Sequence, residues 1–236
     1  MEILGLITAR GGSKSIPGKN VKLLAGKPLI RWTIDEAMKS SLVSRLVVST
    51  DDDEIERVSL EGGAEVPFRR PAEMAGDASP HIEVIIHALE WLKFEQDYEP
   101  DYVLLLQPTS PFRTVIDIDG AIQLAALRPE SEAIVGVSET EHHPFLAKKI
   151  EGEGVLEDFV KTDIPYLRRQ DLPPAYVING AIYLNKTESL RKIRKLIPSG
   201  TLAYVMPQDR SLDVDTPWDF YLADLIMRDR MRHEIH

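Results

Sequence analysis

Four short, almost unbroken runs of apolar residues alternate with amphipathic stretches along the first part of the chain. The runs are rich in β-branched residues and span residues 3–8, 45–50, 102–106 and 133–137. Between them, apolar residues recur at helical spacing over residues 28–39, 52–61, 80–94 and 115–127. A strand is apolar along its whole length when helices cover both faces of its sheet. The alternation therefore predicts an α/β fold, with a mostly parallel sheet and helices on both faces.

The alternation stops after Val137. Residues 138–176 contain two strand-like pieces, 145–151 and 155–161, on either side of a Glu-Gly-Glu-Gly turn. Two strands joined by a glycine-containing turn form a hairpin. The pattern then resumes with strands at 177–184 and 202–206 and helices at 187–195 and 216–230. We therefore expect one α/β domain made of residues 1–137 and 177–236, interrupted by a hairpin subregion at 138–176 that contacts a partner or forms a lid.

The composition excludes several classes of protein. The formal net charge of −10 argues against a nucleic-acid binder, which needs a basic face for the phosphate backbone. Because the chain has no cysteine, disulfides and thiolate metal sites are excluded, and a reducing, cytoplasmic location is expected. No apolar run reaches the ~20 residues that cross a bilayer, and the first residues have the pattern of a strand and not of a signal peptide. We therefore expect neither nucleic acid nor a membrane as a partner.

Basic residues are concentrated near the N-terminus, although the whole chain is acidic. Up to Ile34 the only acidic residue is Glu2, whereas the basic residues are Arg10, Lys14, Lys19, Lys22, Lys27 and Arg31. A local cationic region in an acidic protein favours a small anion as ligand. An ordinary solvated surface is the alternative, and we favour it for the last three of these residues.

The segment Ala-Arg-Gly-Gly-Ser-Lys-Ser-Ile-Pro-Gly-Lys-Asn at residues 9–20 lies between the first expected strand and the first expected helix. Its glycines let the backbone approach a ligand closely, and exposed N–H groups together with Arg10 and Lys19 suit a polyphosphate. It is not a Walker A loop, because five residues separate Gly12 from the Gly-Lys pair where that motif has four, and Asn20 replaces the hydroxyl residue. A Rossmann Gly-x-Gly-x-x-Gly is absent as well. The spacing alone indicates an anion-binding loop, with a structural turn as the alternative.

As an ordered string, residues 9–20 resemble the opening motif of the CMP-sialic acid synthetase family, the acylneuraminate cytidylyltransferases, with Ser15 where that family usually has glycine. Further segments resemble motifs of the same family in the same order: Arg-Pro-Ala-Glu-Met-Ala-Gly-Asp-Ala-Ser at 70–79, Leu-Gln-Pro-Thr-Ser-Pro-Phe-Arg at 106–113, Asn-Gly at 179–180 and Asp-Val-Asp-Thr-Pro at 213–217. The resemblance covers nearly the whole chain. It implies a Rossmann-like nucleotidyltransferase that moves CMP from CTP to the anomeric hydroxyl of a nine-carbon acidic sugar, of the sialic, legionaminic or pseudaminic acid type, and releases pyrophosphate.

The resemblance also implies which residues do this work. The catalytic residues are Arg10, Lys19 and Asp215. The nucleotide-binding residues are Ala9, Arg10, Gly11, Gly12, Ser13, Lys19, Asn20, Arg70, Ser79, Gln107, Thr109 and Ser110. The sugar-binding residues are Gln107, Asn179, Lys161, Arg168 and Arg169. Local capping is the alternative for Arg70 and Ser79.

The three sugar-binding cations lie in the subregion 138–176. In the family that the chain resembles, this region forms a dimer interface and reaches into the partner's active site, so a homodimer is expected. Arginine can grip the sugar carboxylate with two parallel hydrogen bonds. A solvated hairpin face is the alternative for each of these cations.

Asp213 and Asp215 alternate in an expected extended segment, so both side chains can face the same side. Two hard oxygen ligands on one face, completed by triphosphate oxygens, suit Mg²⁺. The family motif that this segment resembles binds a metal. The alternative is that these acids cap the helix that begins near Pro217, a role that we assign to Asp219. We therefore expect Mg²⁺ as the cofactor, held by Asp213 and Asp215.

Two other functions remain open at this point. An enzyme of the same fold could use another nucleotide, such as GTP, or a sugar 1-phosphate, because a Gln-Pro-Thr-Ser loop does not identify the base. A nucleotide-binding module without turnover is the other alternative. Such a module would have no need of the two carboxylates, so we rank it last.

Overall fold

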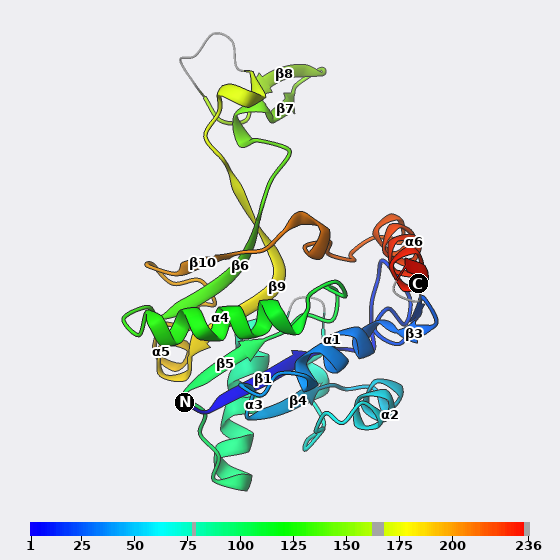
Figure 1. Cartoon of the computed structure of the whole chain (residues 1–236), viewed down its shortest axis with the longest axis vertical. Coiled ribbons are helices and arrows are strands. Elements are labelled where there is room, and N and C mark those ends of the chain that lie inside the picture. Colours follow the sequence, from blue (N-terminus) through cyan, green and yellow to red (C-terminus); the bar gives the residue numbers. More distant parts are fainter. Residues whose placement is uncertain (77–78, 162–167, 234–236) are drawn as a thin grey trace.

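The computed structural model describes residues 1–76, 79–161 and 168–233, and its body is a six-stranded sheet between layers of helices (Figure 1). The strand order is β10-β6-β9-β5-β1-β4. These strands are β1 (Ile3–Thr8), β4 (Arg45–Ser49), β5 (Tyr102–Leu105), β6 (Ala133–Glu139), β9 (Tyr176–Lys186) and β10 (Leu202–Val205). β9 is antiparallel to both of its neighbours, and the other pairings in this sheet are parallel. Asp77 and Ala78, which belong to the motif that ends at Ser79, lie outside the described residues.

Two layers of helices cover the sheet, because side chains along a strand point alternately to its two faces. One layer consists of α1 (Leu29–Met38), α2 (Asp53–Glu61) and α4 (Val115–Leu127), and the other of α3 (His81–Gln96) and α5 (Thr187–Ile193). Along β1, Ile3 and Ile7 pack into the first layer, whereas Leu4 and Leu6 pack into the second. The predicted α/β fold with a mostly parallel sheet is therefore confirmed.

Side-chain caps fix where two of these helices begin. The carboxylate of Asp52 accepts hydrogen bonds from the N–H groups of Glu54 and Ile55, which would otherwise have no partner at the start of α2. At the start of α4, Thr114 and Asp117 form a reciprocal capping box. The box holds the Asp117 carboxylate at the N-terminus of the helix.

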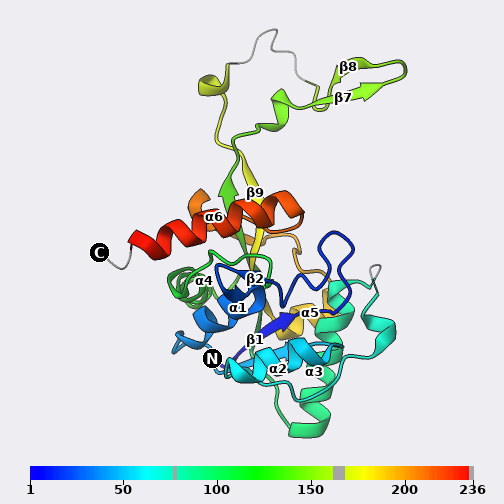
Figure 2. The same cartoon turned by 90° about the vertical axis from the view of Figure 1, so that its right-hand side faces the viewer.

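The last helix, α6 (Pro217–His233), packs outside the sheet and over the segment that follows β1 (Figure 2). An apolar cluster joins this helix to that segment and to the short strand β2 (Leu23–Leu24), which pairs with β3 (Lys27–Pro28). Val214 is fully buried in this cluster. Its burial places the residues on either side of it, Asp213 and Asp215, next to the loop at 9–20.

Residues 138–176, which we call the arm, leave the body where β6 and β9 run out of the sheet together (Figures 1 and 2). The arm carries the hairpin of β7 (Lys148–Glu151) and β8 (Val155–Asp158), so the predicted hairpin is present with shorter strands than predicted. Pro144 begins a 3-10 turn, η2 (Pro144–Leu146), where the sequence pattern predicts strand. A second turn, η3 (Arg169–Asp171), precedes β9.

Large apolar side chains of the arm are exposed. They are Leu146, Ile150, Val155, Leu156, Phe159 and Tyr176. A cluster of exposed apolar side chains on one element is more typical of an interaction surface than of free protein surface.

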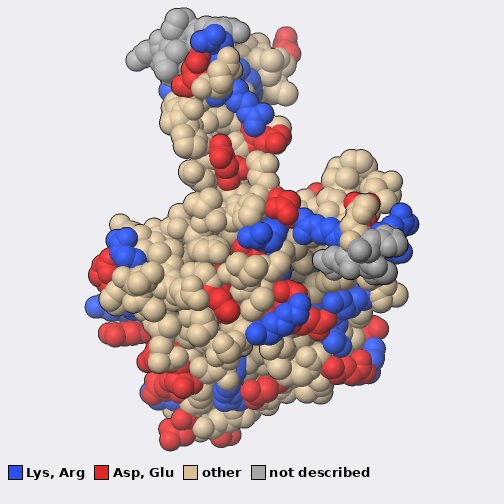
Figure 3. Space-filling view, in the orientation of Figure 1, with Lys and Arg blue, Asp and Glu red and all other residues tan. Residues whose placement is uncertain are grey.

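Charged side chains of both signs are intermixed on the face shown in Figure 3. This face of the described residues therefore lacks the broad basic patch that a nucleic-acid backbone requires. Among the residues that the structure describes, no helix is both long enough and apolar enough to cross a membrane.

Candidate active site

A cleft of 620 Å³ opens beyond the carboxyl ends of β1 and β5, the end of the sheet at which α/β folds bind ligands. Its walls come from the loop after β1, the segment before α3, the loop after β5, strand β9 and the segment before α6. The lining residues are Thr8, Arg10, Gly12, Ser13, Lys14, Ser15, Lys19, Asn20, Arg70, Met74, Gly76, Ser79, His81, Val84, Gln107, Pro108, Thr109, Ile178, Gly180, Tyr183, Asp213 and Asp215. The fold thus brings residues from all the recognised sequence motifs to one place.

The predicted site residues fall into three groups in the structure. Those that line the cleft are Arg10, Gly12, Ser13, Lys19, Asn20, Arg70, Ser79, Gln107, Thr109, Asp213 and Asp215. Those that lie beside it without lining it are Ala9, Gly11, Ser110 and Asn179. Those on the arm, exposed and away from this cleft, are Lys161, Arg168 and Arg169.

The second group supports the walls of the cleft. Gly11 donates its N–H to Oδ1 of Asp51 at 3.0 Å, and a Cβ at this position would lie 2.6 Å from Oδ2 of Asp52. Asn179 is buried, and its Oδ1 accepts the N–H of Ala181 at 3.1 Å. Glycine and asparagine at these positions thus shape the backbone on which the lining residues sit.

Lys19 joins the first loop to the acidic segment near the C-terminus. Its ammonium group donates to the carbonyl of Val214 at 3.0 Å and to Oδ1 of Asp215 at 3.1 Å. Beside it, Nδ2 of Asn20 donates to the carbonyl of Arg10 at 3.0 Å, which closes the loop on itself. An anion that enters the cleft therefore meets a lysine that is already held in place.

Asp213 and Asp215 both face the cleft, but their surroundings differ. The Asp215 side chain is 69% exposed. Asp213 is partly buried, and this burial raises its pKa above the usual value, helped by the charge of Asp215 and opposed by a hydrogen bond from Thr109. Its Oδ1 is buried without a hydrogen-bond partner. The segment thus presents one unsatisfied carboxylate oxygen and one exposed carboxylate to the same space.

A divalent cation fits this pair of carboxylates. Within the described residues, no group of three or more His, Cys, Asp or Glu side chains could hold a metal. A cation bound by Asp213 and Asp215 would therefore need further oxygen ligands from a nucleotide and from water. Mg²⁺ is commonly bound in this way, because proteins often hold it through one or two carboxylates together with substrate phosphates and water. The assignment of Mg²⁺ to this pair stays a prediction.

We expect Asp213→Asn to raise the thermal unfolding midpoint at neutral pH when divalent metal is removed with a chelator. Because burial raises the pKa of Asp213 in the folded state, its contribution to stability is favourable at low pH and is lost as the pH rises through that raised value. Asparagine removes the charge and keeps the shape. The gain should disappear below about pH 3, where aspartate is protonated in both states. Asp215→Asn is the matched control, and an unchanged or lower midpoint for Asp213→Asn at neutral pH would contradict the assignment.

Arg70 and His81 give another part of the cleft its polar character. Arg70 is buried and donates from Nε to Oγ of Ser49 at 3.1 Å and from Nη2 to the carbonyl of the same residue. Burial lowers the pKa of Arg70 to about 10, so it remains charged at neutral pH. Burial, and then the charges of Arg70 and Arg10, lower the pKa of His81. The cleft therefore offers a fixed guanidinium and a neutral imidazole side by side, and both can bind the polar edges of a nucleoside.

Arg113 holds the loop after β5 against β9. It is fully buried and donates from Nη1 to the carbonyls of Ala181 at 2.7 Å and Gln107 at 3.3 Å. Burial lowers the pKa of Arg113 to about 10. Gly180 has a φ of +73°, and Gln107 lies over it so closely that a Cβ would be 2.6 Å from Gln107 Oε1. The position of Gln107 in the cleft thus depends on a glycine on the neighbouring strand.

We expect Gly180→Ala to lower kcat/KM at least tenfold, because the new methyl group would displace Gln107. A residue with a Cβ also loses about 1–2 kcal/mol in the left-handed region, so the free energy of unfolding should fall by roughly that amount. Gly200→Ala is the control, because its φ of +80° has the same backbone cost and its Cβ would meet nothing within 4 Å. Steady-state kinetics and urea unfolding measure both effects. Equal kcat/KM for the two variants would show that the place of Gln107 is unimportant.

Sequence reasoning left several lining residues out. Lys14, Ser15, Met74 and Pro108 lie inside the recognised motifs, so extending each motif to all its members would include them. Val84 and Tyr183 have no such signal, because apolar and aromatic residues in helices and strands are usually core residues. Arg113 is the last residue of the motif at 106–113, but its complete burial has no signature in the sequence.

The mostly parallel sheet and the cleft at its carboxyl end, lined by basic side chains and a pair of carboxylates, are those of a nucleotidyltransferase. The cytidylyltransferase family pattern matches residues 4–204, and the chain belongs to this family. It is 38% identical to the CMP-N,N'-diacetyllegionaminic acid synthase of Legionella pneumophila, over 96% of this chain and 97% of that protein. It is 37% identical to an N-acylneuraminate cytidylyltransferase of Streptococcus agalactiae, over 93% of this chain and 52% of that protein, so the chain spans about half the length of this second relative. The resemblance to the CMP-sialic acid synthetases is therefore confirmed.

A solved structure shows the same fold. The chain superposes on CMP:2-keto-3-deoxy-manno-octonic acid synthetase, complexed with CTP, with a TM-score of 0.73 over 98% of this chain and all of that chain. The two sequences are 19% identical, so the likeness establishes the fold.

Proposed function

We propose that this protein transfers CMP from CTP to the anomeric hydroxyl of a nine-carbon acidic sugar and releases pyrophosphate. The observation that carries the proposal is the meeting of Lys19 with Asp215 in one cleft, at 3.1 Å, beside the unsatisfied Oδ1 of Asp213. Phosphate-binding cations and metal-binding carboxylates are both needed for transfer of a nucleotidyl group, whereas a nucleotide-binding module needs only the cations. The names of the Legionella and Streptococcus relatives, a legionaminic acid synthase and an acylneuraminate enzyme, support the class of acceptor.

In this reaction the anomeric oxygen forms a bond to the α-phosphorus of CTP. The bond from that phosphorus to the bridging oxygen of pyrophosphate breaks, and the hydroxyl proton leaves to solvent. Arg10 and Lys19 bind and neutralise the phosphate oxygens, and the backbone of Gly12 and Ser13 approaches them closely. Most of the rate then comes from positioning and from charge neutralisation.

Asp213 and Asp215 would hold Mg²⁺ in this scheme. The cation, when bound, neutralises phosphate charge and lowers the pKa of a coordinated hydroxyl group. The protein's own part is to keep the two carboxylates beside the phosphate-binding lysine, which it does through the hydrogen bonds of Lys19 to Val214 and Asp215.

The substrate test is pyrophosphate release from each of the four nucleoside triphosphates, paired with a panel of acidic sugars and sugar 1-phosphates. We expect release with CTP and a nine-carbon acidic sugar. Release with GTP and a sugar 1-phosphate, and none with CTP, would show that the alternative enzyme is the right one. Binding of CTP without release of pyrophosphate for any acceptor would favour the non-catalytic module.

As part of the same proposal, we place the enzyme in the cytoplasm, since the chain has no cysteine to oxidise.

We propose further that the enzyme works as a homodimer in which the arm of one protomer reaches the cleft of its partner. Two observations support this: the exposed apolar side chains of the arm, and the distance of its cations from the cleft of their own chain (Figure 1). In the dimer, Lys161, Arg168 and Arg169 would bind the sugar carboxylate.

Mixed subunits test the shared site. Asp215→Ala and a triple variant, Lys161→Ala with Arg168→Ala and Arg169→Ala, should each lose most activity. An equal mixture of the two variants should, after subunit exchange, regain about a quarter of the full activity, because half of the dimers are then mixed and one of their two sites is intact. No recovery after verified subunit exchange would contradict the shared site.

A further inference from the structure

The segment that carries Asp213 and Asp215 lies outside regular secondary structure. After β10 the chain forms a single 3-10 turn, η4 (Gln208–Arg210), and then continues without a strand or helix until α6 begins at Pro217. The N–H of Val214 donates to the carbonyl of Thr109 at 2.8 Å. The other hydrogen bonds and ion pairs between this segment and the body are made largely by side chains, so side chains largely determine the positions of the two carboxylates.

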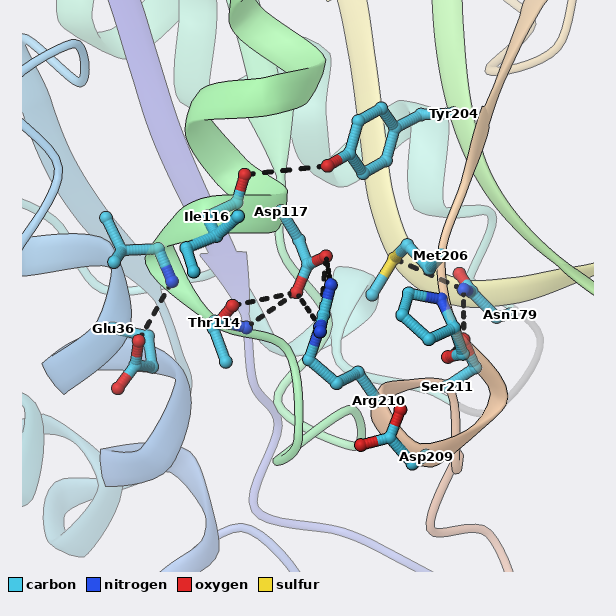
Figure 4. A network of polar contacts seen from close by, with 12 residues as sticks. Glu36, Thr114, Ile116, Asp117, Asn179, Tyr204, Met206, Asp209, Arg210 and Ser211 are labelled. Atoms are coloured by element: carbon cyan, nitrogen blue, oxygen red, sulfur yellow. Dashed lines mark hydrogen bonds and ion pairs between the residues drawn. The ribbon is translucent and has the colours of Figure 1, made fainter.

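The strongest of these ties joins Arg210 to Asp117 (Figure 4). Nε of Arg210 donates to Oδ2 of Asp117 at 2.9 Å, and Nη2 donates to Oδ1 at 2.9 Å, so the guanidinium grips both carboxylate oxygens. The Asp117 side chain is completely buried. It also accepts the N–H of Thr114 at 3.0 Å and the hydroxyl of Thr114 at 2.9 Å, through the capping box at the start of α4. A buried carboxylate with this many donors has a single position, and it gives Arg210 a fixed anchor.

A second tie acts on the next residue of the same segment (Figure 4). Nδ2 of Asn179 donates to Oγ of Ser211 at 3.0 Å, and that hydroxyl donates to the carbonyl of Pro207 at 2.7 Å. Asn179 lies on β9 next to Gly180, which lines the cleft. The segment is therefore pinned at residues 210 and 211, two residues before the first carboxylate that faces the cleft.

We propose that Asp117 and Arg210 are a positioning pair that sets the geometry of the metal-binding carboxylates without touching the substrate. The inference rests on the proposed function. Asp117 is held by the body and Arg210 precedes Asp213 by three residues, so loss of the pair would free the segment between η4 and the bond of Val214 to Thr109. Asp213 would then sample several positions relative to Asp215, which Lys19 and Asp219 still hold, and the joint affinity of the two carboxylates for a cation would fall.

The guanidinium of Arg210 suits this task for a geometric reason. Its planar fork matches the two oxygens of Asp117, which fixes orientation as well as distance, whereas a lysine would make a single point contact. The hydrogen bonds that Arg210 donates to Asp117 raise the pKa of Arg210, so its guanidinium is charged at neutral pH. Arg210→Lys should therefore keep the charge and lose the orientation.

Calorimetric titration of CTP, with chelator and then with Mg²⁺, tests the pair. The variants are Arg210→Lys, Arg210→Gln and Asp117→Asn, and the quantity compared is the gain in CTP affinity on adding Mg²⁺. We expect CTP affinity in chelator to change less than twofold in all of them. The gain from Mg²⁺ should fall at least tenfold in Arg210→Gln and Asp117→Asn, and about threefold in Arg210→Lys. Tyr204→Phe is the control, because the Tyr204 hydroxyl donates to the carbonyl of Ile116 at the start of the same helix and, within the described residues, hydrogen-bonds to neither Asp117 nor Arg210; it should leave the gain unchanged.

The outcomes separate this inference from the function on which it rests. A Mg²⁺-dependent gain that is the same in Arg210→Lys as in the unaltered protein, with only the unfolding midpoint lowered, would overturn the inference and leave the function standing. If the unaltered protein shows no Mg²⁺-dependent gain, both the metal site and the positioning pair are wrong. The lysine variant keeps the test decisive if the neutral variants do not fold.

Discussion

Asp215→Ala is expected to lower kcat by at least ~10³-fold, about 4 kcal/mol of transition-state stabilisation, while CTP still binds in the absence of metal. Asp215 is an exposed carboxylate, and Lys19 keeps its hydrogen bond to the carbonyl of Val214 when Asp215 is replaced, so the loop at 9–20 stays in place. The substitution removes one of the two carboxylates that would hold a cation, and the developing charge on pyrophosphate would then be poorly neutralised. The measurements are single-turnover kinetics at saturating Mg²⁺ and CTP titration in chelator.

Asp229→Ala is the matched control for Asp215→Ala. Both aspartate side chains are 69% exposed, and each variant removes one negative charge. Asp229 lies near the end of α6 and is outside the cleft. Its replacement should leave kcat within twofold. Near-normal activity of Asp215→Ala in magnesium would show that the metal assignment is wrong.

Lys19→Met is expected to lower kcat/KM by roughly 10²–10³-fold, the usual effect of losing one donor to developing negative charge. The Lys19 side chain is only 13% exposed, and its ammonium reaches both Val214 and Asp215. Methionine keeps the apolar stem and removes the charge. In contrast to Asp215→Ala, this variant should bind CTP more weakly even in chelator, because the lysine contacts the phosphates directly in our scheme.

Lys22→Met is the control for the loss of one positive charge from the segment that follows β1. Lys22 is exposed and lies over the ring of Phe220 at 4.9 Å, outside the cleft. We expect kcat/KM within twofold of the unaltered protein. If Lys19→Met and Lys22→Met have the same modest effect, the loop acts through its overall charge, and no specific phosphate contact by Lys19 is needed.

The main features of the fold could be predicted from the sequence because burial leaves a pattern. β1, β4 and β5 are covered on both faces, so they are apolar throughout, and the helices between them keep an apolar face. The direction of β9 could not be predicted, because an antiparallel strand between two covered faces has the same apolar pattern as a parallel one. The shorter strands of the hairpin have a similar cause, since the arm has no core of its own to define where its strands begin.

Some contacts of the candidate site could be predicted from the sequence, and others could not. Lys19, Asp213 and Asp215 could be predicted to meet, because they lie in motifs with a definite order and because strand ends converge in an α/β sheet. The Asp117–Arg210 pair could not be predicted. Asp117 reads as an ordinary first-turn acid of a helix, and its complete burial depends on elements far away in sequence. Contacts between side chains that are far apart in the sequence can be identified only from the three-dimensional structure.

Isotopic labelling of the acceptor tests most directly whether CMP is transferred at the α-phosphorus. An acidic sugar labelled with ¹⁸O at the anomeric hydroxyl is incubated with CTP, Mg²⁺ and the enzyme, and the masses of the products are measured by mass spectrometry. We expect the label to be retained in the bond between the sugar and CMP, and pyrophosphate to be unlabelled. Loss of the label to water, or formation of pyrophosphate without any labelled CMP-sugar, would contradict it.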